Sequence, residues 1–165
     1  MSNAPAGPSA ADLEALAGYA SVLAAGVAAS IGPWVERSVA TVCTNAGVMI
    51  TGNLRRNAAE AGAEATAVVA PQVRALLELD IDEQRMGPLE LVRAAVRWPT
   101  EVLREAGVPE VRRDEAAKAM FPDDVYDLTP GSFKDVDPSL HEPGLVWGAA
   151  KAHVHLARRR AAGQI

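Results

Sequence analysis

The first long segment of the chain has apolar side chains spaced three or four residues apart, which is the period of one helix face. The side chains on this face are Leu13, Leu16, Ala20, Leu23, Val27, Ile31 and Trp34. No residue between Glu14 and Glu36 is charged, and small residues fill most other positions. A helix without charge must be covered by its own fold, by another subunit or by lipid. We expect this one to be the buried central helix of a soluble bundle.

Glycine and proline divide the rest of the pattern into further helices. Pro33 is expected to begin a second helix, and Pro71 is expected to kink or split a long one. Gly47 and Gly107 are expected to end helices. The run 48–51 is strand-like, but it is too short and isolated to imply a sheet. The expected helices span residues 10–30, 33–46, 53–79, 88–98, 99–106, 113–120 and 143–161.

A proline-rich segment, 121–144, separates the last two expected helices. Its prolines interrupt any long element, but apolar side chains continue throughout, so we expect an ordered, irregular covering segment. The fold class predicted is all-α, an irregular helical bundle with this segment before its last helix. The expected organisation is a disordered tail over 1–9, a single helical domain over 10–161 and a short tail over 162–165.

Composition and charge exclude few of the possible fold and function classes. A length of 165 residues suits one domain, and a net charge of −5 argues weakly against a general nucleic-acid binder. No basic residue precedes Asp12, so we expect no ordinary signal peptide. The segment 15–35 is long enough to cross a bilayer, but it is built largely from Ala and Gly. We therefore expect a cytoplasmic protein for which a membrane partner is unfavourable.

The chain gives little support for metal or cofactor chemistry. Cys43 is the single cysteine, which excludes an internal disulfide and a multi-cysteine zinc site within one chain. His153 and His155 lie two residues apart, and on a helix such side chains point about 200° apart, so they cannot chelate one ion. We expect no metal, no cofactor and no assigned catalytic residue.

Three carboxylates form the densest acidic group near aromatic residues, and they are Asp123, Asp124 and Asp127. Two of them close together in a cleft would resemble an acid/base pair. With His141 they define one alternative, a small enzyme or metal-binding protein. Ion pairs are the more common role for such carboxylates. The expected basic partners are Arg112, Arg113 and Lys118.

The leading hypothesis is a non-catalytic regulatory or scaffold protein that acts through protein–protein association, possibly with itself. It depends on the small-residue helix faces of 15–54, which exceed what one such chain is expected to cover. The aromatic side chains predicted as interface anchors are Trp34, Trp98 and Trp147.

A second alternative is a nucleic-acid-associated protein that uses its C-terminal arginines, because a stripe of cations would hold phosphates. Its candidate residues are Arg158, Arg159 and Arg160. Other basic residues that could line one face with them are Arg55, Arg56, Arg93, Arg97, Arg104, Arg112, Arg113 and Lys151.

Three phrases suggest a resemblance to known sequences: RAAVRWPTEVLREAGVP, FPDDVYDLTPGSF and HEPGLVWGAAKAHVH. The stretch from Arg93 to His155 that contains them resembles small Ala-rich helical proteins of high-GC actinobacteria. The resemblance implies a bacterial, cytoplasmic setting. It implies no particular activity.

Overall fold

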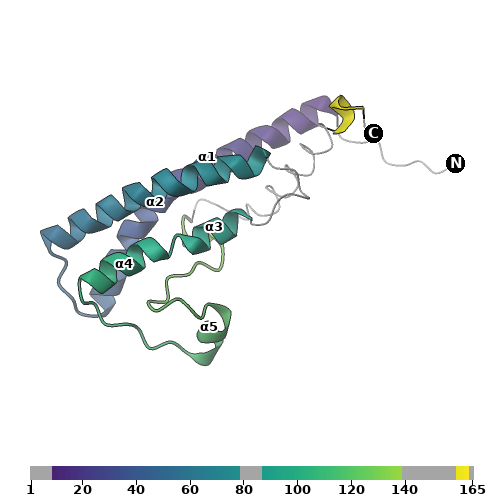
Figure 1. Cartoon of the computed structure of the whole chain (residues 1–165). Coiled ribbons are helices and arrows are strands. Elements are labelled where there is room, and N and C mark those ends of the chain that lie inside the picture. The colour runs from purple at the N-terminus through teal and green to yellow at the C-terminus, as the bar shows by residue number, and fades with distance from the viewer. Residues whose placement is uncertain (1–8, 79–86, 139–158, 164–165) are drawn as a thin grey trace.

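The computed structural model describes residues 9–78, 87–138 and 159–163. Its elements are α1 (Ala10–Asn45), α2 (Gly52–Glu78), α3 (Pro88–Ala94), α4 (Arg97–Glu105), α5 (Glu115–Met120) and the 3-10 helix η2 (Phe133–Asp135). No β-strand occurs in these ranges, so the all-α prediction is confirmed. Figure 1 shows α1 and α2 as a long helical pair, with α3 and α4 along one side and α5 beyond α4.

The two long helices approach each other closely where two glycines face each other. A Cβ atom added to Gly62 would lie 2.8 Å from the carbonyl oxygen of Gly32. No side chain fits at that separation, so the two backbones touch directly. Apolar side chains continue the contact away from this point, with Val27 and Ile31 of α1 in the same cluster as Val69 of α2.

The expected break at Pro33 is wrong, because α1 continues through this residue from Ala10 to Asn45. Proline removes one helical hydrogen bond and can cost about 3 kcal/mol inside a helix. Pro33 itself is exposed, so the carbonyl left without a partner can be hydrated. Ile31 and Val35 on either side are fully buried. Packing on both sides of the proline therefore holds the helix together.

The other boundaries follow the sequence pattern more closely. Gly47 and Gly107 adopt φ of 68° and 73° just after α1 and α4, as expected for helix-ending glycines. The long helix α2 also continues past Pro71 without a split. The break expected at Pro99 lies instead at residues 95–96, and Pro99 is inside α4. Prolines are tolerated in a first helical turn, where their missing N–H is not needed.

The buried apolar side chains form two clusters along the helical pair. The first surrounds Ile31, Trp34 and Trp98, and the second surrounds Cys43 and Leu103. Ala61 of α2 packs against both clusters. Because α1, α2 and α4 each contribute to both clusters, the described core is continuous.

The described part of the proline-rich segment, 121–138, places aromatic and apolar side chains into this core. Tyr126 belongs to the second cluster, and Phe133 and Val136 belong to the first. Arg37 of α1 donates a hydrogen bond of 2.5 Å to the carbonyl of Val136. Residues 139–144 and most of the last expected helix lie outside the described residues. None of the helices in the described ranges combines the length and apolar content that crossing a bilayer requires.

Candidate binding groove

The residues singled out from the sequence lie in very different places. Trp34 and Trp98 are each 5% exposed and belong to the core, so neither ring faces solvent as an interface anchor would. Arg159 and Arg160 are exposed in a helical turn, which Figure 1 shows well apart from α5. Three further candidates, Trp147, His141 and Arg158, lie outside the described residues.

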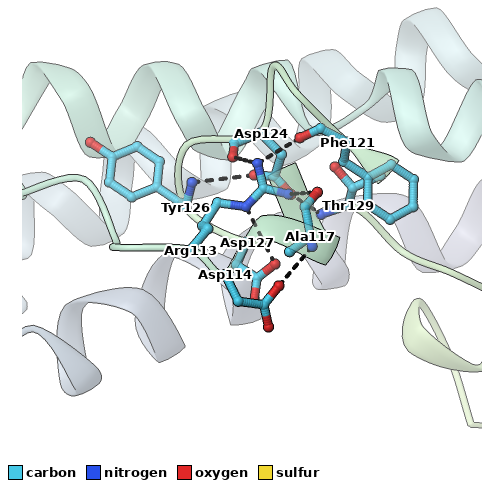
Figure 2. Close-up of polar contacts among 8 residues, drawn as sticks. All are labelled: Arg113, Asp114, Ala117, Phe121, Asp124, Tyr126, Asp127 and Thr129. Atoms are coloured by element: carbon cyan, nitrogen blue, oxygen red, sulfur yellow. Dashed lines mark hydrogen bonds and ion pairs between the residues drawn. The ribbon is translucent and has the colours of Figure 1, made fainter. Parts of the chain in front are cut away.

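Arg113 organises the segment that follows α4, as Figure 2 shows. Its side chain is buried, and its guanidinium donates to the carbonyls of Phe121 (2.5 Å), Ala117 (2.7 Å) and Asp124. Its Nε lies 3.7 Å from a carboxylate oxygen of Asp127. One cation thus holds α5 and the turn after it in a fixed arrangement. The sequence prediction of an ion pair between this arginine and the acidic group is confirmed.

The buried carboxylate of Asp124 holds the next turn in place. The residue is 5% exposed, and its carboxylate accepts hydrogen bonds from the backbone N–H groups of Tyr126 (3.2 Å) and Thr129 (2.5 Å). Both carboxylate oxygens are therefore occupied by backbone donors. The Tyr126 hydroxyl in turn donates to the carbonyl of Val108 at 2.8 Å, which ties this turn to the end of α4.

The three clustered carboxylates consequently have three separate roles. Asp124 binds backbone N–H groups, Asp127 faces Arg113, and Asp123 is exposed. An acid/base pair needs two carboxylates that share one environment, which these contacts do not provide. No group of three metal-ligating side chains gathers anywhere in the described ranges.

An open groove of about 470 Å³ lies between α3–α4 and the segment after α5. Arg93, Arg97 and Arg104 line one wall, spaced four and seven residues apart on one side of the helices. The apolar residues in the groove include Val96, Met120 and Phe121, and the acidic residues are Asp123 and Asp124. Of these, Met120 is 69% exposed, so its apolar side chain is accessible to a partner.

Arg93 joins the two walls of the groove. Its Nε donates a hydrogen bond of 3.2 Å to the carbonyl of Pro130, and its guanidinium carbon lies 5.5 Å from the centre of the Phe121 ring. These contacts link α3 to two points of the opposite wall. These non-covalent contacts therefore fix the two walls of the groove relative to each other.

The other two arginines remain exposed. The guanidinium carbon of Arg97 lies 4.0 Å from the centre of the Trp98 ring, a cation–π contact. Arg104 is 3.6 Å from Glu110, and both side chains are more than half exposed. An exposed ion pair of this kind contributes little to stability. These two cations are available to a ligand at low energetic cost.

Sequence reasoning had included all three groove arginines among many basic residues that could share a face. Within the described residues the structure brings these three together in the groove, whereas Arg113 is buried and Arg55 and Arg56 lie on the exposed surface of α2. The helical spacing of Arg93, Arg97 and Arg104 is the sequence signal that distinguishes these three arginines from the other basic residues.

Two ionisable groups near the core are shifted by their surroundings. Burial raises the pKa of the Cys43 thiol above its ordinary value. Burial also raises the pKa of the Tyr126 hydroxyl, and the negative charge of Glu110 adds to that effect. Both groups therefore stay neutral near pH 7, and a thiol with a raised pKa is a poor nucleophile.

Comparison with known proteins does not extend this description. No protein-family model, no curated protein and no solved structure matches the chain.

Proposed function

We propose that this chain is a non-catalytic helical protein that acts by associating with another protein, and that the groove is its binding surface. The observation that carries the proposal is that three arginines and an exposed Met120 line one groove, whose walls are joined by non-covalent contacts. Arginine and methionine are enriched where proteins bind other proteins. This retains the association hypothesis but moves its site from the buried tryptophans to the groove.

Rigidity of the groove supports a binding role. Arg113, Asp124 and Arg93 each fix a different part of its walls through hydrogen bonds to the backbone. A surface that is already arranged loses less conformational entropy when a partner binds. The segment after α4 contains few regular elements, so these contacts give it an order that secondary structure does not provide.

Affinity capture from the native host tests the proposal. The bait is the full chain, compared with a double variant, Arg97→Gln with Arg104→Gln, which removes both exposed groove cations. The matched control changes two exposed arginines of α2, Arg55→Gln with Arg56→Gln, and leaves the groove intact. Both variants change exposed residues only, so circular dichroism should show the same fold for them as for the unaltered chain.

We expect at least one protein that the unaltered chain and the α2 control retain equally and the groove variant loses. Sedimentation of each purified protein shows whether that partner is a second copy of the chain. Equal retention by all three baits would contradict the groove as the binding surface.

A further inference from the structure

We infer that the groove binds an acidic protein segment that has an apolar side chain between its carboxylates. The inference rests on the proposed function, because it names the class of partner for the same groove.

Arg97 is prepared to receive a carboxylate. Its guanidinium carbon lies over the buried ring of Trp98, a contact that uses none of its N–H groups as hydrogen-bond donors. No hydrogen bond or ion pair occupies those N–H groups within the described part of the chain. A planar guanidinium held in this way can donate two parallel hydrogen bonds to one carboxylate. The Trp98 ring thereby contributes to the site from beneath, without facing the partner itself.

Arg104 provides a second contact on the same wall. Seven residues separate it from Arg97 within α4, which corresponds to about 10 Å along the helix axis. Its Glu110 partner is exposed, and a ligand carboxylate can displace it at small cost. A partner helix with glutamates seven residues apart would present two carboxylates at the same spacing.

The apolar part of the groove selects a protein segment over a polyphosphate. Met120 is exposed, and Val96 and Phe121 line the groove with it. An apolar side chain of the partner would cover these three residues. Nucleic acid offers continuous phosphates but no apolar side chain that would cover Val96, Met120 and Phe121.

A labelled helical peptide of about 15 residues, with glutamates seven apart and leucines between them on the same face, tests the inference by fluorescence anisotropy. Two control peptides replace either the glutamates by glutamine or the leucines by serine. The protein is the full chain, together with Arg97→Gln, Met120→Ser, Asp123→Asn and the α2 control Arg55→Gln with Arg56→Gln.

Binding of the acidic peptide is expected to weaken about tenfold in Arg97→Gln, because two charge-assisted hydrogen bonds are lost. Met120→Ser is expected to weaken it several-fold, and both control peptides should bind less tightly than the acidic one. Asp123→Asn is expected to strengthen binding about twofold to threefold, since a like charge leaves the groove. The α2 control should bind as the unaltered chain does.

Three results would overturn the inference: equal affinity for the acidic and glutamine peptides, no effect of Arg97→Gln, or tighter binding of a single-stranded oligonucleotide that depends on Arg97. Affinity capture separates this failure from failure of the proposed function. A partner that requires Arg97 and Arg104, but whose binding is unaffected by competing acidic peptide, would leave the groove as the association surface and exclude this class of partner.

Discussion

Arg113 carries a buried positive charge in a segment that has almost no regular secondary structure. Its compensation comes from the carbonyls of Ala117, Phe121 and Asp124, together with the nearby carboxylate of Asp127. Each of those carbonyls would lack a side-chain donor if the arginine were removed. The residue therefore stabilises the outer wall of the groove through backbone contacts, which few other side chains could make simultaneously.

Arg113→Met is expected to lower the free energy of unfolding by about 3 kcal/mol, because the buried carbonyl of Asp124 loses its charged donor and the carbonyls of Ala117 and Phe121 keep only their backbone donors. Arg113→Lys should cost less, since an ammonium keeps the charge but reaches fewer of the acceptors. Urea unfolding followed by circular dichroism measures both. A methionine variant as stable as the unaltered protein would contradict the assigned role.

Tyr126 gives a prediction that depends on pH. Its hydroxyl donates to the Val108 carbonyl, so Tyr126→Phe is expected to cost about 1–2 kcal/mol at pH 7. Burial raises the pKa of this hydroxyl above its ordinary 10.0, so the folded state holds the proton more tightly than the unfolded state does. The contribution is complete below about pH 10 and is lost as the pH rises through the folded-state pKa.

The stability difference between the unaltered protein and Tyr126→Phe should therefore shrink above pH 10, as measured by urea midpoints from pH 7 to 11. Cys43, whose pKa burial also raises, is present in both proteins, so its own titration contributes to the stability of each. A difference that stays constant to pH 11 would show that the hydroxyl does not ionise differently in the two states.

At the scale of helices, the contact between α1 and α2 depends on the absence of side chains at its closest point. Alanine normally favours a helix over glycine by about 1 kcal/mol. At Gly62, however, the added Cβ would lie 2.8 Å from the Gly32 carbonyl oxygen, so the helices would have to separate. The loss of packing along both helices should outweigh the gain in helix propensity.

Gly62→Ala is accordingly expected to destabilise the protein by about 1–3 kcal/mol, as overpacked core substitutions do. Gly18→Ala in α1 is the matched control, because nothing lies within 4 Å of its added Cβ. This control should stabilise the protein by up to about 1 kcal/mol. Thermal unfolding of the two variants measures the contrast, and a stabilising Gly62→Ala would mean that the two backbones do not touch.

Helix boundaries were predictable from sequence where a local conformation decides them. Gly47 and Gly107 end helices because positive φ is easily reached by glycine, and that preference is readable in one residue. The helix break predicted at Pro33 is wrong because burial of Ile31 and Val35 against another helix outweighs the local cost of the proline. Packing against another helix cannot be read from the neighbouring residues in the sequence. The same distinction explains why α3 and α4 divide at residues 95–96 and not at Pro99.

The candidate site likewise has one wall that the sequence pattern could predict and one that it could not. The spacing of Arg93, Arg97 and Arg104 is a local helical pattern and was visible in the sequence. The opposite wall depends on which carbonyls Arg113 reaches and on which N–H groups Asp124 binds. Those contacts occur across irregular backbone, where no period relates sequence separation to distance.

At the scale of the whole molecule, the two apolar clusters are parts of one folding unit. The helices α1, α2 and α4 each supply side chains to both clusters, and Ala61 contacts both. Neither cluster can lose its packing while these helices stay in place. We therefore expect the described core to unfold in a single cooperative transition.

Leu103→Ala tests this expectation, because Leu103 is fully buried in the second cluster while Trp34 and Trp98 report on the first. The substitution should cost about 2–4 kcal/mol through lost burial and the cavity it leaves. Because the clusters share their helices, the loss should lower the urea midpoint of tryptophan emission as much as that of Cys43 labelling. The emission is measured in a Trp147→Phe background, so that only the two core indoles contribute.

Val73→Ala supplies the reciprocal control, since Val73 is fully buried in the first cluster and Cys43 reports on the second. The urea midpoints of tryptophan emission and of Cys43 labelling should again fall together. The decrease should be smaller than for Leu103→Ala, because valine leaves a smaller cavity than leucine does. If each substitution moved only the probe of its own cluster, the two halves of the helical pair would be separate folding units.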